Sequence, residues 1–207
     1  MARPIVKTFT VADEALTGFA SDVTGATWTL TTTATSDGLA HQVSVVNDSI
    51  NDHSAKTAVL VGTDANNNAQ TETINLPGIS ATVESTKYFK TLTSITPSAT
   101  IGADTMDIGW VDEIASNTIL LNAGFNCVAA TVSVIVTGTI NFTVQECFEH
   151  VLGGYSPNWV STASIASKTA STTAQISIHA SAVRVITSSY SSGAALQVTI
   201  RQDRPVG

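Results

Sequence analysis

Apolar and polar residues alternate in short runs along this chain, and a period of two is typical of β-strands that bury one face. In INFTVQ, residues 140–145, every second side chain is apolar. In ALQVTIRQ, residues 195–202, the apolar side chains of Leu196, Val198 and Ile200 share one face. The pattern therefore predicts strands rather than helices.

Further runs have the same alternation or an apolar, strand-like composition, and turn-forming residues such as Asp37-Gly38 separate them. Thr and Val, which are stiff at χ1 and fit a pleated strand, are abundant throughout. Short strands at regular turn spacing favour a sandwich or a jelly-roll-like barrel. We expect strands in the stretches 26–35, 41–48, 56–64, 69–78, 87–98, 104–113, 127–138, 174–181 and 182–189.

The length of 207 residues allows one large domain or two small ones. We expect an all-β chain of two antiparallel β-sandwich or jelly-roll-like domains with a short N-terminal arm. The arm covers residues 1–24, the first domain 25–113 and the second 114–207, with the boundary between Glu113 and Asn117. The arm could hold one short helix or extend toward a neighbouring subunit. A single intertwined domain is the alternative.

Charged residues make up 12% of the chain, against roughly 25% in ordinary soluble domains. The formal net charge is −7 and there is no basic run, so we expect no direct binding of nucleic acid. We also expect no membrane partner, because no run approaches the roughly 18 apolar residues of a span. Residues 1–16 lack the apolar core of a signal peptide, which predicts synthesis in the cytosol.

The weakly charged surface that this composition implies has two interpretations. A soluble monomer usually keeps a denser coat of charges. A subunit that buries much of its surface against copies of itself does not need one. We expect a homo-oligomer, and a monomer covered by Thr and Ser is the alternative.

The two cysteines, Cys127 and Cys147, are too few for a disulfide scaffold. If a hairpin turned at residues 137–139, facing positions would sum to about 274–276, and 127 + 147 gives 274. The two cysteines would then be lateral neighbours on antiparallel strands, and a cross-strand disulfide would be geometrically possible. Two free thiols remain the default, because a protein made in the cytosol starts reduced.

Motifs for metals or catalysis are scarce. No two histidines have the spacing H-x-H or H-x-x-x-H, and no C-x-x-C is present, so the sequence predicts no zinc site and no cofactor. There is no G-x-S-x-G elbow and no Walker loop, so we expect no enzyme. A hydrolase whose carboxylates meet only in the fold stays open as a third interpretation. The four histidines are His41, His53, His150 and His179.

The sequence DANNN, residues 64–68, begins like the calcium loop of an EF-hand. Such a loop needs Gly at its sixth position and Glu at its twelfth, and this chain has Ala69 and Asn75 there. A tight polar hairpin turn is the expected structure, since Asn tolerates the left-handed conformation that such turns use.

Tyr155 and Trp159 flank the sequence SPN in a predicted loop. Two exposed rings could form a small platform for a sugar, or they could pack against a neighbouring subunit. We take Tyr155 and Trp159 as the candidate contact residues for a subunit or a ligand.

The stretch VGTDANNNAQTETINLPGISATVESTKYFKTLTSITPS, at 61–98, is similar to a pattern of small virion proteins of tailed bacteriophages. The elements INFTVQECFEHV, NW, KTAS and AVRVITSSYSSGAALQVTIRQ resemble a second recurrent phage module. Together the resemblance covers roughly residues 38–110 and 139–202. The chain departs from these patterns at Asn67-Asn68, which replace a Gly-Asn turn, and at Cys147 and Glu149-His150, which replace Thr and Asp-Asp.

The resemblance implies a structural virion protein that assembles in the host cytoplasm and carries out no catalysis. It would be a capsid decoration protein or a head–tail junction (collar or neck) component. Its partners would be copies of itself and other virion proteins, such as the major capsid, portal or tail proteins. The alternative is a receptor- or carbohydrate-binding module of a phage fibre or adhesin, which would use the loop of Tyr155 and Trp159.

Overall fold

The structure is a computed structural model that describes residues 4–121, 129–149 and 157–203. Within these ranges the chain forms β-strands and one short 3₁₀ turn, Ala163–Ile165, and it has no α-helix. The predicted all-β, sandwich-like fold class is confirmed. The abundance of β-branched residues and the period-two alternation explain why strands prevail over helices.

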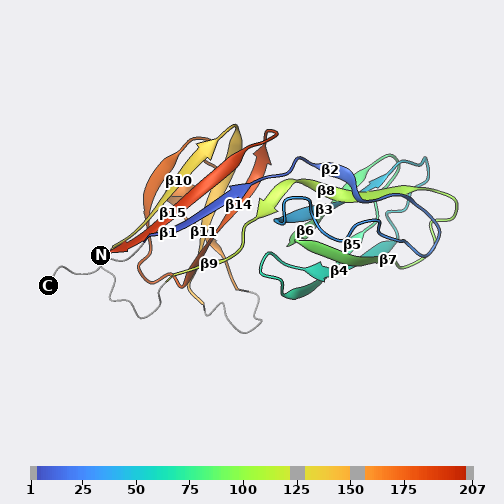
Figure 1. The fold of residues 1–207 in the computed structure, drawn as a ribbon. Helices are drawn as coiled ribbons and strands as arrows, with labels where there is room; N and C mark the ends of the chain where they lie inside the picture. Colours follow the sequence, from blue (N-terminus) through green and yellow to red (C-terminus); the bar gives the residue numbers. More distant parts are fainter. Residues whose placement is uncertain (1–3, 122–128, 150–156, 204–207) are drawn as a thin grey trace. The chain divides into compact units, whose positions relative to one another are not determined.

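The chain divides into two compact units (Figure 1). Unit 1 consists of Met1–Ala12 and Ser116–Gly207, and unit 2 of Asp13–Ala115. Unit 2 is therefore inserted between the first strand of unit 1 and the remainder of that unit. The division after Ala115 lies between Glu113 and Asn117, where the composition placed the boundary.

Unit 2 consists of two antiparallel sheets. The first has the order β2 (Ala15–Val23), β8 (Met106–Ala115), β3 (Ala40–Asn47) and β6 (Thr82–Phe89). The second has the order β5 (Ala69–Asn75), β4 (Thr57–Thr63) and β7 (Thr91–Pro97). Each strand turns its apolar face inward, so the core lies between the sheets.

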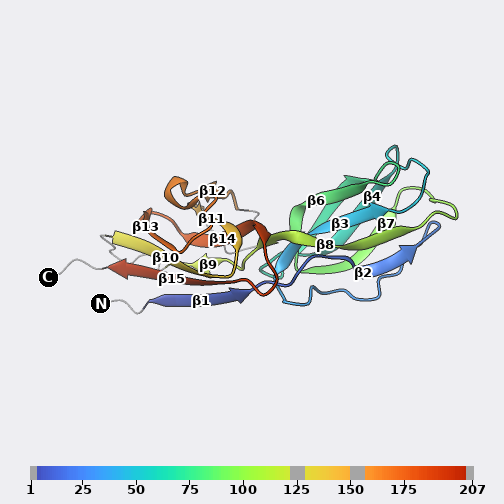
Figure 2. The ribbon, with the colours of Figure 1, turned by 90° about the horizontal axis from the view of Figure 1, so that it is seen from above.

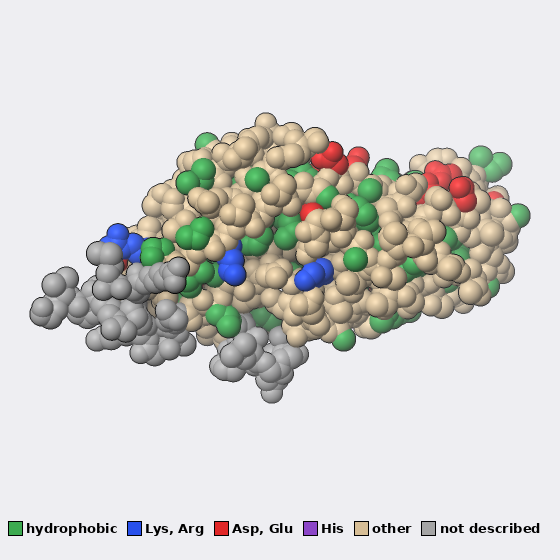
Figure 3. Space-filling view, viewed as in Figure 1, with side chains coloured by type: hydrophobic (Ala, Val, Ile, Leu, Met, Phe, Trp, Pro, Cys, Tyr) green, Lys and Arg blue, Asp and Glu red, His purple; other side chains and the backbone are tan. Residues whose placement is uncertain are grey.

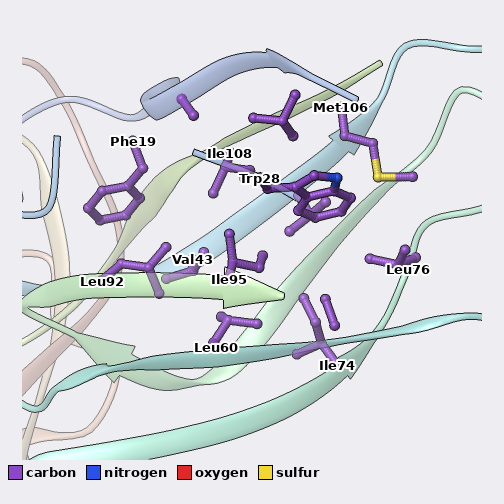
Figure 4. Close-up of a cluster of buried hydrophobic side chains, with 14 of the residues drawn as sticks. Phe19, Trp28, Val43, Leu60, Ile74, Leu76, Leu92, Ile95, Met106 and Ile108 are labelled. Carbon is purple, nitrogen blue, oxygen red and sulfur yellow. The ribbon is translucent and has the colours of Figure 1, made fainter. Parts of the chain in front are cut away.

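The core of unit 2 receives large side chains from both sheets (Figure 4). Phe19 from β2 and Trp110 from β8 meet edge to face, with ring centroids 5.1 Å apart. Burial of this apolar surface is the main stabilising contribution in such a sandwich. The labelled core residues are Phe19, Trp28, Val43, Leu60, Ile74, Leu76, Leu92, Ile95, Met106 and Ile108.

The pairing of β2 with β8 depends on two glycines. A Cβ at Gly109 would lie 1.9 Å from the carbonyl oxygen of Ala15, and one at Gly18 would lie 2.2 Å from a ring carbon of Trp110. Both distances are too short for any real contact, so only glycine permits this approach. The indole N–H of Trp110 donates a 3.0 Å hydrogen bond to the carbonyl of Asp13, which fixes the ring over β2.

Unit 1 also has two layers of antiparallel strands (Figure 2). One has the order β1 (Ile5–Thr10), β15 (Ala195–Asp203), β10 (Ala129–Thr137) and β13 (Thr172–Ile176). The other is formed by β12 (Val160–Ser161), β11 (Ile140–Cys147), β14 (Ala182–Tyr190) and β9 (Ile119–Leu120). Alternate residues of β10, β11 and β15 are fully buried, as their period-two patterns predict.

The predicted N-terminal arm, residues 1–24, contains two strands in its described part, β1 and β2. β1 pairs along its whole length with β15, from Ile5 opposite Ile200 to Thr10 opposite Ala195. The following strand, β2, belongs to unit 2. Phe9 is buried, so this segment gains both ladder hydrogen bonds and apolar contact, which a free arm would forgo.

The predicted hairpin of β10 and β11 is wrong. β10 pairs with β13 and β15, whereas β11 pairs with β12 and β14. The connection contains Gly138 at φ +78° and takes the chain from one sheet to the other. Both strands alternate as predicted. They belong to different sheets, however, so their apolar faces are buried as parts of two layers and not of one hairpin.

Three further strand predictions differ from the structure. The stretch 26–35 contains no named strand; Thr31 and Thr32 both donate from their backbone N–H groups to the carbonyl of Phe19. The stretch 87–98 is divided at Lys90, between β6 and β7, which belong to different sheets. The third, at 174–181, ends at Ile176 in the structure, so Ile178 is exposed rather than turned inward.

The DANNN turn is confirmed. It connects β4 to β5, with Thr63 opposite Ala69. The Asp64 carboxylate accepts the backbone N–H groups of Asn66 and Asn68 at 2.8 and 2.9 Å. Asn67 adopts the left-handed conformation with φ of 65°, so the Asp and Asn residues serve the turn itself.

Leu60→Ala tests the core of unit 2, because Leu60 on β4 is fully buried. We expect a loss of about 2–5 kcal/mol in the free energy of unfolding, from lost burial and the cavity that remains. The matched control is Val59→Ala on the same strand, whose exposed side chain predicts a change within about 0.5 kcal/mol. Chemical denaturation measures both, and equal effects would contradict the assigned faces of β4.

Candidate interaction surface

A buried carboxylate organises one end of unit 1. Glu146 lies on β11 on the same face as the core residues Phe142 and Val144. Its Oε1 accepts a 2.6 Å hydrogen bond from the Thr162 hydroxyl, and its Oε2 accepts the Ser177 backbone N–H at 2.8 Å. Two segments far apart in the sequence are thus attached to the end of one strand.

Further hydrogen bonds join the chain segments at this end. The Ser181 backbone N–H donates to the carbonyl of Cys147 at 2.8 Å, and the Leu121 N–H donates to the carbonyl of Ser181 at 2.9 Å. The Glu149 carboxylate accepts both the backbone N–H and the side-chain amide of Asn158, at 3.0 and 2.7 Å. These two bonds lower the pKa of Glu149. Hydrogen bonds therefore join the described segments at this end.

Four exposed apolar side chains come from these joined segments. Val160 lies on β12 opposite Glu146, and Phe148 and Ile178 follow β11 and β13. Leu120 on β9 lies opposite Ala182, which itself pairs with Cys147. We call this set the unit 1 apolar end: Leu120, Phe148, Val160 and Ile178.

Trp159, the predicted contact residue, lies beside this end and is half-buried. Its ring carries the Arg184 guanidinium 4.6 Å from the ring centre, in cation–π geometry. Arg184 also donates a 2.8 Å hydrogen bond to the side-chain oxygen of Gln145 on β11. One face of the ring is therefore occupied and unavailable for stacking on a sugar. Tyr155 lies outside the described residues.

The structure describes only one of the two cysteines of the predicted disulfide. Cys147 is a free, fully buried thiol at the end of β11, whose sulfur accepts the backbone N–H of Glu149 at 3.4 Å. Cys127 lies outside the described residues, so the disulfide stays a prediction. The hairpin register from which it was argued is wrong, because β10 and β11 belong to different sheets.

Two buried histidines in unit 2 are held by polar partners. His41 directs Nδ1 at the carbonyl of Val111, 3.0 Å away, and Nε2 at the carboxylate of Asp37, also 3.0 Å away. His53 accepts from the Lys56 ammonium at Nδ1 (3.0 Å) and donates from Nε2 to Asp104 (2.8 Å). Each ring therefore has a hydrogen-bond partner at both nitrogens.

The described parts of the chain hold no group of three His, Cys, Asp or Glu side chains placed to bind a metal ion. Their structure also has no helix long and apolar enough to cross a membrane. Comparison of the chain with protein-family models, with curated proteins and with solved structures found no match in any of the three.

The alternation pattern contained a signal for the unit 1 apolar end. In TVQECF, Glu146 occupies a position of the apolar face, which is unusual unless the carboxylate has buried partners. Sequence reasoning passed over it because its donors, Thr162 and Ser177, are remote along the chain.

Glu146→Ala should lower the free energy of unfolding by about 2–4 kcal/mol, since two buried donors lose a charged acceptor. The matched control is Glu14→Ala, whose side chain is exposed and should change stability by less than about 0.5 kcal/mol. Thermal denaturation of both variants measures the difference. Equal stability of the two would show that the buried carboxylate has no organising role.

The stability of the fold should depend on pH through Asp104, and the direction of its pKa shift gives the sign of that dependence. Hydrogen bonds from Asn51, and then the bond and charge of His53, hold the pKa of Asp104 below its ordinary value. The ionised carboxylate stabilises the folded state fully above the ordinary pKa of about 3.9. This stabilisation is lost as pH falls through the lower pKa that the group has in the folded state. Wild type should exceed Asp104→Asn in stability at about pH 5, and the gap should close near pH 2. Urea denaturation at both pH values tests this, and a gap independent of pH would contradict it.

Proposed function

We propose that this chain is a structural virion protein of a tailed bacteriophage, a self-associating capsid decoration or head–tail junction (collar or neck) component without catalysis. The observation that carries the proposal is the unit 1 apolar end, where four apolar side chains stand exposed on a hydrogen-bonded framework. The phage resemblance of residues 38–110 and 139–202 supplies the biological setting.

Rigidity favours association at this end. A surface that is already ordered loses little conformational entropy when a partner binds. Glu146 and Ser181 fix the backbone from which Phe148 and Ile178 project. The adjacent Trp159 and Arg184 are of the residue types most enriched among strong contributors to interfaces.

The surface composition points the same way. Figure 3 shows a face formed mainly by uncharged polar groups and backbone, with scattered hydrophobic side chains and few charges. Burying such a surface against another subunit requires little desolvation of charge. Closed symmetric rings repeat one contact many times, so a modest patch suffices for stable assembly.

Receptor or carbohydrate binding is the weaker candidate. It relied on the rings of Tyr155 and Trp159, and Arg184 already covers one face of Trp159 at 4.6 Å. No described feature of unit 1 favours a glycan over a protein surface.

Phe148→Ser should weaken self-association at least about tenfold, because it removes a central apolar contact. Ile135→Ser is the matched control: Ile135 on β10 and Phe148 are each 51% exposed, so the two changes remove similarly accessible surface. Light scattering across a concentration series gives the association constants. A monomer at all concentrations, or equal effects of the two variants, would oppose self-association through this end.

The virion assignment has its own test. Mass spectrometry of purified particles of the phage that encodes this chain should detect it at a copy number that matches a symmetric assembly. Labelling of the particles with an antibody against the chain should place it on the head or the neck. Absence of the chain from purified virions would overturn the proposal.

A further inference from the structure

Unit 2 exposes a second apolar feature that is distinct from the unit 1 apolar end. Ile50, in the loop after β3, is 82% exposed, and Ile79, in the loop between β5 and β6, is 59% exposed. Among the large hydrophobic side chains that the structure describes, these two are the most exposed. Exposing apolar side chains to water is unfavourable, and a partner that covers them removes this cost.

The two loops are fixed to one another by Asn47, which is almost fully buried. Its side-chain N–H groups donate to the carbonyls of Asn51 at 2.9 Å and Gly78 at 2.7 Å. Its side-chain oxygen accepts both the backbone N–H and the hydroxyl of Ser49. Ser80 donates from its N–H to the Ser49 carbonyl at 3.2 Å. The loops that carry Ile50 and Ile79 are therefore held together before any partner arrives.

Carboxylates surround these isoleucines. The ends of β2 and β3 and the start of β8 meet here, since Met106 pairs with both Val23 and Asn47. Hydrogen bonds and close approaches bring acidic residues of three segments to this place. We call the following set the unit 2 tip: Ile50 and Ile79 with Asp22, Asp48, Asp52, Asp104 and Asp107. Figure 3 shows acidic and hydrophobic side chains close together at the upper right of the view.

The positive groups nearby are already engaged. Lys56 donates to the Thr100 carbonyl at 2.8 Å and to His53 at 3.0 Å, and His53 donates to Asp104. Three of the other carboxylates interact unfavourably: burial raises the pKa of Asp48, and the negative charges of Asp107 and Asp22 raise it further. Like charges held together in this way oppose folding, so folding alone does not account for them.

We propose that the unit 2 tip docks a protein partner whose apolar pocket is bordered by Lys and Arg side chains. Ile50 and Ile79 would fill the pocket, and the carboxylates would pair with its basic border. A second copy of this chain fits poorly, because tip against tip brings five carboxylates against five and the chain carries a net charge of −7. The inference does not depend on the proposed virion function.

The test uses the full chain and two defined probes. One is an amphipathic helical peptide of Leu and Lys, and the other is the same peptide with Glu in place of every Lys. Calorimetry should give at least about tenfold tighter binding for the Leu/Lys peptide. Raising the salt concentration should weaken that binding, because exposed charges are screened.

Substitutions at exposed apolar positions test which surface binds the peptide. The double change Ile50→Ser and Ile79→Ser should weaken binding of the Leu/Lys peptide at least about tenfold. Val59→Ser, at an exposed apolar position on β4, should leave it unchanged. Phe148→Ser should also leave it unchanged, which separates this surface from self-association through the unit 1 apolar end. Wild-type affinity in the Ile50/Ile79 variant would overturn the proposal, as would equal binding of the two peptides.

The variant Asp48→Asn separates a loss of binding from a loss of folding. Because the folded pKa of Asp48 is raised, its ionised form opposes folding above the ordinary pKa, and removing the charge should increase stability at pH 7. That gain should disappear as pH falls below the ordinary value of about 3.9. The variant should nevertheless bind the Leu/Lys peptide several-fold more weakly. If the variant is more stable but binds the peptide with unchanged affinity, the carboxylates do not contribute to binding as proposed.

A photo-cross-linking amino acid at position 79 tests the protein partner directly in extracts of the cells that produce this chain. The cross-linked residues of the partner, mapped by mass spectrometry, should be apolar and flanked by Lys or Arg. Cross-links that fall mainly on a second copy of this chain would overturn the proposed partner chemistry.

Discussion

The close approach of β2 to β8 is the contact on which unit 2 depends. β8 is bordered by β2 on one side and by β3 on the other, and Gly109 lets the backbone of Ala15 come within a distance that no other residue would allow. Trp110 then covers Gly18 and meets Phe19 at the edge of the core. Because β2 and β3 end and β8 begins beside the loops around Asn47, the same pairing positions the unit 2 tip.

The sequence predicted which residues face inward far better than it predicted which strands are neighbours. Alternation fixes the face of a side chain, and it was right for the buried positions of β10, β11 and β15. It contains no information on sheet membership. The turn at Gly138 and the break at Lys90 both transfer the chain between sheets, and local sequence looks the same whether a strand returns beside its predecessor or opposite it.

The two exposed surfaces differ in the physical origin of their specificity. The unit 1 apolar end is shaped by hydrogen bonds to Glu146 and Ser181, and its specificity comes from shape. The unit 2 tip adds a concentration of negative charge, which discriminates by sign and acts at longer range. Neither surface was visible as a motif. Ile50 and Ile79 are isolated in sequence, and their loops are brought together by the side chain of Asn47 and by the backbone bond from Ser80 to Ser49.

The insertion of unit 2 has a consequence for biosynthesis. β1 is synthesised before unit 2, yet its hydrogen-bonding partner β15 is synthesised after it, with Ile5 opposite Ile200. Unit 2 is complete in a continuous stretch, Asp13–Ala115, so it can fold while translation continues. Until β15 emerges, β1 lacks its pairing partner, and each chain remains open to pairing with a neighbouring nascent chain on the same messenger RNA. Early folding of unit 2 leaves β1 tethered to a folded body during this interval.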